Sequence, residues 1–267
     1  TFGASLMLGI KKNAWYTKLR YSEQRFGDYR IPVDTIIYLT QKMPVYGRRL
    51  KNTAGWERNI NFFTQYQKKG YKSVYAVSNV FQKTGFFPGA HGIPDVSRLE
   101  DDGDSRNIEL PYKVTTHQQY VWEKFILSGD MGYQNNHREE WSAFHTHYGS
   151  QPLPQTNPDK ELGFNLNTFS FSAIGRLIGS SFWEHRMGWD SQFQRNTISG
   201  YSFLLPEYER FTTGVSWLTT YRPDNVLAVS GGIRYDYGRI HVFAHDDPYL
   251  ATYLQEQGYS DEQVESY

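Results

Sequence analysis

Two histidines two positions apart are the first residues whose spacing could support chemistry. In an extended segment His145 and His147 share one side, because successive side chains of a strand point to opposite faces. Two imidazoles on one side can bind a divalent metal or haem iron. Arg138 and Trp141 come shortly before them and are candidate contacts to the same ligand. The alternative is that both histidines are ordinary hydrogen-bonded loop residues.

Glu139 and Glu140 lie near this pair and raise the question of a general base in a metal-dependent hydrolase. Such a site needs a third metal ligand at a recognisable spacing, and the sequence offers none. Glycine-rich nucleotide-binding motifs and the Gly-x-Ser-x-Gly nucleophile motif are also missing. We therefore predict a binding function without catalysis.

The stretch from 84 to 112 holds a second set of candidate ligand contacts. Phe86 and Phe87 precede a proline and supply rigid apolar surface. His91 has glycines close on both sides, which keeps its imidazole accessible to haem iron or to a planar macrocycle. Arg98 adds a positive charge to the same stretch. The alternative is a packed surface loop with a histidine facing solvent.

An acidic run follows at Glu100, Asp101, Asp102 and Asp104. Carboxylates spaced around a glycine resemble a calcium-binding loop, although the run lacks the complete EF-hand pattern. We expect calcium as the one candidate cofactor, held by the three aspartates in an extracellular loop. The alternative is a solvated run of charge that neighbouring arginines neutralise.

Composition excludes several classes of protein. The 267 residues contain 28 Lys+Arg and 28 Asp+Glu, so no basic excess indicates a nucleic-acid partner. The chain has no cysteine, which rules out disulfides and thiolate sites. Aromatic residues make up 17% of a chain whose mean hydropathy is −0.65. Many aromatics in a hydrophilic chain are typical of a protein that is apolar at alternate positions only.

About ten strands are predicted, and they come in pairs. Within each pair the link is short and contains turn-forming residues, as a β-hairpin requires. Between pairs the links are much longer, and this strict alternation is typical of outer-membrane barrels. The predicted short periplasmic turns are near 11–13, 68–70, 123–124, 178–181 and 222–224, and the extracellular loops are 24–55, 83–112, 136–160, 195–207 and 242–267.

Period-two alternation within the strands predicts one apolar face and one polar face. In the segment FWEHRMGWDSQFQ, Trp183, Met187 and Trp189 alternate with polar residues that include Glu184 and Asp190. Aromatics gather at strand ends, and the strands reach the roughly 9–11 residues that cross a bilayer at a tilt. We predict an all-β, antiparallel transmembrane β-barrel with the apolar set against lipid. A large soluble β-sandwich is the alternative.

Several segments between about residues 14 and 240 share a pattern with one family of membrane proteins. They are LRY at 19–21, FGDYRIP at 26–32, LKNTAG at 50–55, VSNVFQK at 77–83, GFFPGAHGIP at 85–94, DDGDSRN at 101–107 and GYQNNHREEW at 132–141. In these segments the chain resembles the barrel of TonB-dependent outer-membrane receptors, above all the Bacteroidetes-type receptors for iron, haem and vitamins.

The resemblance implies an outer-membrane location in a Gram-negative bacterium and a barrel of about 22 strands around an N-terminal plug. It implies import of a scarce, large nutrient such as a ferric siderophore, haem or cobalamin. The implied partners are outer-membrane lipid, TonB acting through the plug, the nutrient and a surface lipoprotein. We expect residues 1–267 to be a segment of such a barrel without its plug.

Three alternatives stay open at this point. A small barrel closed by about ten strands alone is one of them. A binding or adhesion barrel that does not transport is the second. The third is a soluble β-rich module that binds carbohydrate through exposed Trp and Tyr side chains.

Overall fold

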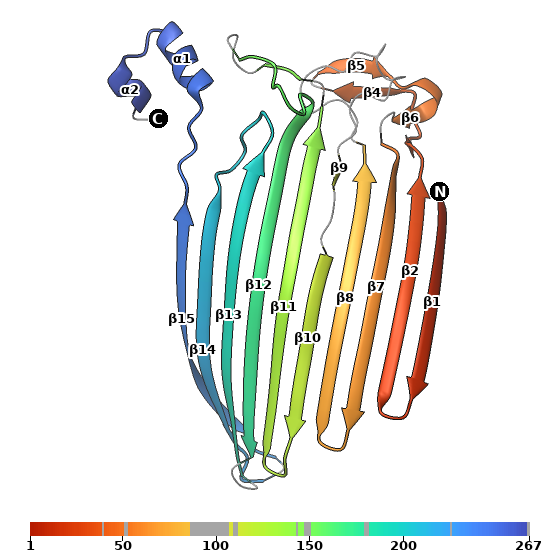
Figure 1. The fold of residues 1–267 in the computed structure, drawn as a ribbon, viewed down its shortest axis with the longest axis vertical. Helices are drawn as coiled ribbons and strands as arrows, with labels where there is room; N and C mark the ends of the chain where they lie inside the picture. The colour runs from red at the N-terminus through yellow and green to blue at the C-terminus, as the bar shows by residue number, and fades with distance from the viewer. Residues whose placement is uncertain are drawn as a thin grey trace.

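The fold is an all-β arrangement dominated by one large antiparallel sheet, with 68% of the described residues in strands. The computed structural model describes residues 1–38, 40–50, 53–85, 107–108, 112–142, 144–146, 151–178, 182–224 and 226–265. Ten long strands follow one another through the sheet in chain order (Figure 1). They are β1 (Phe2–Lys12), β2 (Trp15–Phe26), β7 (Gly55–Lys68), β8 (Tyr71–Thr84), β10 (Tyr112–Val121), β11 (Phe125–Trp141), β12 (Lys160–Ile178), β13 (Trp183–Ser199), β14 (Tyr208–Tyr221) and β15 (Val229–Val242).

Short connections lie at one end of the sheet, the lower end in Figure 1, and long connections lie at the upper end. At the lower end Asn13 has a positive φ of 52°, which asparagine tolerates better than most residues. A Cβ at Gly70 would come within 2.3 Å of the Val121 carbonyl oxygen. Only glycine therefore allows this turn to lie so close to the neighbouring strand.

Small elements occupy the upper end. β3 (Tyr29–Arg30) pairs with β6 (Arg49–Leu50), and β4 (Thr35–Tyr38) pairs with β5 (Gln41–Pro44). A 3-10 turn, η1, spans Tyr46–Arg48, and β9 (Asn107–Ile108) pairs with β8. After β15 come the helices α1 (Pro248–Glu256) and α2 (Asp261–Glu265). The Asp247 side chain caps α1 by accepting backbone hydrogen bonds from Tyr249 and Leu250.

Two predicted loops begin later than the sequence indicated. Residues 136–141 belong to β11 rather than to a loop, and residues 195–199 belong to β13. Pairing with β12 accounts for the extension of β11, since Asn136 lies opposite Leu166 and Glu140 lies opposite Leu162. These partners are 30 and 22 positions apart in the sequence, so local sequence patterns did not reveal them.

The pairing register shows that the sheet has one apolar and one polar face. Directly paired residues share a face, and from strand to strand the same set stays in line, as in Trp189–Val215–Tyr235. The members of the apolar face include Leu6, Leu8, Leu19, Ile60, Phe62, Tyr75, Val77, Leu127, Met131, Phe169, Met187, Trp189, Val215, Trp217, Ile233 and Tyr235.

Within the described residues this apolar face is exposed, and no second layer of structure covers it. Among the described residues, the buried hydrophobic residues are Met43 and Val45, both near the upper end. Trp183 and Trp189, by contrast, are 44% and 50% exposed. A soluble sheet protein buries its apolar face against a second layer. The predicted apolar and polar sides are therefore present, but no protein core covers the apolar one.

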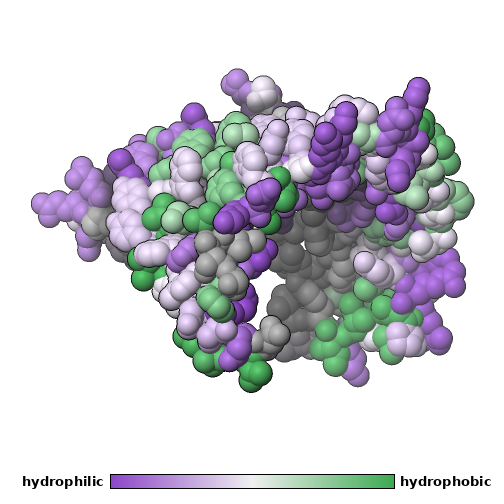
Figure 2. All heavy atoms as spheres, turned by 90° about the horizontal axis from the view of Figure 1, so that it is seen from below, coloured by the Kyte–Doolittle hydropathy of each residue, from purple (hydrophilic) through white to green (hydrophobic). Residues whose placement is uncertain are grey.

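The sheet is curved without being closed. Seen from below in Figure 2, it curls around a hollow that is open on one side. The outermost strands β1 and β15 each have one neighbour, and every residue of both is exposed. The alternative of a small barrel closed by these ten strands alone is therefore wrong for the described part of the chain. The coarser prediction, an antiparallel all-β sheet, is confirmed.

Candidate functional site

The polar face is the more crowded of the two, as expected for the concave side of a curved sheet. A Cβ built at Gly132, Gly188 or Gly214 on this face would come within 2.8 Å of a neighbouring side chain. On the apolar face a built Cβ would come no closer than 3.4 Å at Gly129 and Gly175, but within 2.3 Å of Ser199 Oγ at Gly163 near the upper end. The polar face is also the more enclosed of the two over most of its length, since it carries the buried residues Ser22, Glu140, Glu184, Asn196 and Thr220.

An ion-pair network around Glu184 lines the lower part of this face. Glu184 is 8% exposed and accepts hydrogen bonds from Arg176 over 2.7 Å and from Arg186 over 2.8 Å. Arg222 approaches the same carboxylate at 3.4 Å. Three guanidinium groups around one carboxylate leave excess positive charge on the wall of the hollow.

Higher on the same face, charges of both signs alternate. Arg234 bridges Asp190 at 3.1 Å and Asp236 at 2.6 Å. In the middle of the sheet, between β10 and β11, His117 lies 2.7 Å from Asp130. Such groups hold water and ions well, and they offer hydrogen bonds to a polar ligand that enters the hollow.

At the upper end a chain of hydrogen bonds ties three separate segments together. The Ser142 hydroxyl donates to Glu161 Oε2 over 2.7 Å and lies 2.8 Å from the Tyr201 hydroxyl. The Tyr201 hydroxyl also lies 3.1 Å from His145 Nδ1, and the two rings meet edge to face. Phe144 packs against the other edge of Tyr201, with ring centroids 5.0 Å apart. We call Ser142, His145, Glu161 and Tyr201 the upper network.

Burial gives Tyr201 an altered acidity. Desolvation raises the pKa of the Tyr201 phenol above its ordinary value, and the nearby Glu161 carboxylate acts in the same direction. The hydrogen bond with Ser142 opposes the rise. Tyr201 is therefore neutral at physiological pH and can both donate and accept a hydrogen bond.

The end of β11 carries a second cluster on the other side of the strand. Glu139 accepts hydrogen bonds from Lys160 over 2.5 Å, from the Trp141 indole over 3.1 Å and from His137 over 3.0 Å. Arg138, on the polar face, pairs with Glu140. These contacts fix the last residues of β11 relative to Lys160, the first residue of β12.

Of the predicted ligand contacts, three lie in the described residues, and the structure brings them to the same end of the sheet. Arg138 and Trp141 are in β11, with their side chains engaged by Glu140 and Glu139 respectively. His145 packs on Tyr201. The other predicted residues lie outside the described part of the chain, namely Phe86, Phe87, His91, Arg98, His147 and the calcium candidates Asp101, Asp102 and Asp104.

Sequence reasoning missed the residues that complete the upper network. Tyr201 is 59 positions from Ser142 and 56 from His145, and it has no motif around it. The one available signal was a lone tyrosine directly after a glycine at the end of a strand, which is common. Within the described residues no group of three or more His, Asp or Glu side chains could hold a metal ion.

None of the described helices is long and apolar enough to span a membrane. No protein-family model matches the chain, and no curated protein matches it in sequence.

Proposed function

We propose that the chain is part of the wall of a transmembrane β-barrel in the outer membrane of a Gram-negative bacterium, in a receptor of the TonB-dependent type. The observation that carries this proposal is the uncovered apolar face, which continues in register across all ten strands. Exposing so much apolar surface to water would be costly, at about 25 cal/mol for each Å². Lipid removes that cost.

An aromatic belt at the lower end of the sheet supports the membrane setting. Successive rings have centroids between 4.7 and 6.1 Å apart across five strands and one turn. Aromatic girdles mark the membrane–water interfaces of such barrels. The members of this lower aromatic belt are Trp15, Tyr66, Tyr71, Tyr120, Trp122 and Phe125.

The free edges support the view that this wall is one part of a larger barrel. β1 and β15 leave one row of backbone groups each without a strand partner in the described residues. In hydrocarbon such groups need partners, because no water is there to replace them. We propose that further strands of the same receptor pair with both edges, as a barrel of about 22 strands requires.

Nutrient binding would take place at the upper, extracellular end. There the long connections gather, and the upper network joins the segments around Ser142, Glu161 and Tyr201. Arg138 and His145 offer a charge and an imidazole, and the stretch at 84–112 would add His91. Contact between the plug and TonB would then open a path through the barrel for a siderophore, haem or cobalamin.

The test is an uptake experiment with the complete receptor gene. A deletion strain should lose growth on one limiting nutrient among haem, ferric siderophore and cobalamin, and the intact gene should restore it. His91→Ala and His145→Ala should each weaken uptake while surface abundance, measured by antibody labelling of whole cells, stays constant.

Two other outcomes separate the rival functions. Recovery of the protein from the outer membrane without any nutrient phenotype would favour an adhesion or binding barrel. Recovery from the soluble fraction as a cooperatively folded protein that binds glycans would favour a carbohydrate-binding module and would overturn the membrane proposal.

A further inference from the structure

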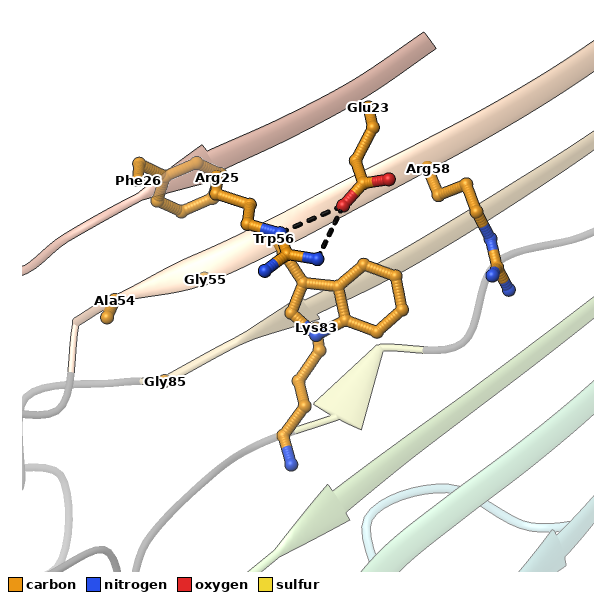
Figure 3. Close-up of a pocket in the computed structure, with 9 residues that line it drawn as sticks. All are labelled: Glu23, Arg25, Phe26, Ala54, Gly55, Trp56, Arg58, Lys83 and Gly85. Carbon is orange, nitrogen blue, oxygen red and sulfur yellow. Dashed lines mark hydrogen bonds and ion pairs between the residues drawn. The ribbon is translucent and has the colours of Figure 1, made fainter. Parts of the chain in front are cut away.

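A pocket of about 620 Å³ lies at the upper ends of β2, β7 and β8. Figure 3 shows Glu23, Arg25, Trp56, Arg58 and Lys83 gathered around it. The pairing register places these side chains on the apolar face rather than on the polar one. Two rows of directly paired residues cross the three strands here, Arg25–Trp56–Lys83 at the rim and Glu23–Arg58–Phe81 just below it.

These rows interrupt the apolar face at a defined height. The next rows down the same face are Tyr21–Ile60 and then Leu19–Phe62, which are apolar. On β2, Arg25 follows Trp15 of the lower aromatic belt by ten residues. Ten residues rise about 33 Å along a strand, which at a tilt of about 40° covers about 25 Å of height. That is the height of the apolar band of outer-membrane barrels, so the pocket sits where the upper lipid headgroups begin.

The pocket carries two positive charges that its own acidic residue does not neutralise. Glu23 pairs with Arg25 at 2.8 Å. In the part of the chain that the structure describes, neither Arg58 nor Lys83 forms an ion pair with a carboxylate.

Aromatic rings hold the Arg58 guanidinium in place. It lies 5.6 Å from the centre of the Trp56 ring and 5.7 Å from that of Phe81. The two rings themselves are 4.6 Å apart. A guanidinium stacked on rings keeps its N–H donors available at its edge, where they match the oxygens of a phosphate group.

We propose that this pocket binds the phosphate group of a phosphorylated glycolipid headgroup in the outer leaflet. Arg58 and Lys83 contact the phosphate, and Trp56 packs against the attached sugar. The site lies outside the barrel wall and is separate from the nutrient path along the polar face. The inference rests on the proposed function, because it requires the apolar face to meet lipid.

The test measures lipid binding to the complete, detergent-extracted receptor by native mass spectrometry. The probes are a bis-phosphorylated diglucosamine glycolipid (lipid A) and the same lipid after enzymatic removal of both phosphates. The wild type should prefer the phosphorylated form. The double variant Arg58→Gln/Lys83→Gln should bind it about a hundredfold more weakly, since each charge-assisted contact contributes about tenfold.

Lys68→Gln provides the matched control. Lys68 lies on the same face of the same strand as Arg58 but at the lower end, paired with Tyr71. Its replacement should leave affinity for the phosphorylated lipid unchanged. Equal affinity of the wild type for both lipids, or unchanged binding by the double variant, overturns the site.

Two further measurements distinguish failure of the lipid assignment from failure of the proposed membrane function. Displacement of the lipid by millimolar inorganic phosphate would show a site for free phosphate and overturn the lipid assignment. Cell fractionation tests the proposed function independently. Absence from the outer membrane removes both proposals, whereas normal membrane recovery without phosphate selectivity removes only this one.

Discussion

Met187 of β13 is paired directly with Trp217 of β14, and the two side chains lie on the apolar face, 59% and 48% exposed. Neither residue has a protein layer over it. The pair therefore identifies the surface on which a charge should be least tolerated if that surface meets lipid.

Met187→Arg should impair assembly in the outer membrane. A charge on the lipid side near the midplane costs about 2–4 kcal/mol. Gln192→Arg puts the same charge on the polar face of the same strand, where water is available, and should assemble normally. The measurement is the heat-resistant, folded fraction of each variant in isolated membranes. Equal assembly of both variants would show that the faces have been assigned to the wrong surroundings.

Glu184→Gln should destabilise the folded protein by about 2 kcal/mol, because it removes the largely buried charge that binds the partly exposed Arg176 and Arg186. Urea unfolding of the protein reconstituted in lipid measures the change. Glu209→Gln is the control, since its pair with Arg195 is long at 3.6 Å and solvent-accessible. It should change stability by less than about 0.5 kcal/mol.

Tyr201→Phe should loosen the segments joined by the upper network, since it removes the hydroxyl that meets Ser142 and His145. Each lost hydrogen bond weakens the local structure by about 1 kcal/mol. Faster hydrogen exchange at 142–146 and 200–202 would reveal it. Exchange in the variant at the wild-type rate would mean that this hydroxyl does not anchor the loops.

The same tyrosine predicts a response to alkaline pH. Because burial raises the pKa of Tyr201, its neutral form stabilises the fold below the unfolded value of about 10, and this contribution is lost as pH rises through the folded pKa. The protection of 142–146, measured as the exchange rate relative to the intrinsic base-catalysed rate at each pH, should therefore fall at high pH in the wild type. Tyr201→Phe, which cannot ionise, should show no such fall in protection.

The turn that contains Asp224, at the lower end of the sheet, should loosen in acid rather than in alkali. Backbone N–H groups of Leu227 and Val226 donate to its carboxylate over 2.7 and 2.8 Å and lower the pKa of Asp224. Its contribution is present above the unfolded pKa of about 3.9 and is lost as pH falls through the folded value. Asp224→Asn should remove this acid-induced loss of protection, measured as the exchange rate of the 222–228 turn relative to its intrinsic rate at each pH. A variant whose turn still loosens in acid like the wild type would contradict the assignment.

The strands, their two faces and the alternation of short and long links were predictable from local sequence patterns alone. These properties are local: side chains alternate every two residues, and turns need only a few residues such as Asn13 or Gly70. FWEHRMGWDSQFQ therefore separated Trp189 from Asp190 without any knowledge of neighbouring strands. The upper limit of β11 was missed because its last residues are polar on both sides.

Tertiary structure decided which of those residues meet. Tyr201 reaches Ser142 and His145 only because β12 and β13 return the chain to the same end of the sheet. Arg25, Trp56 and Lys83 form one row only in the register that pairs β2, β7 and β8. Register and curvature depend on contacts between distant segments, and a shift of one residue would turn each side chain to the other face.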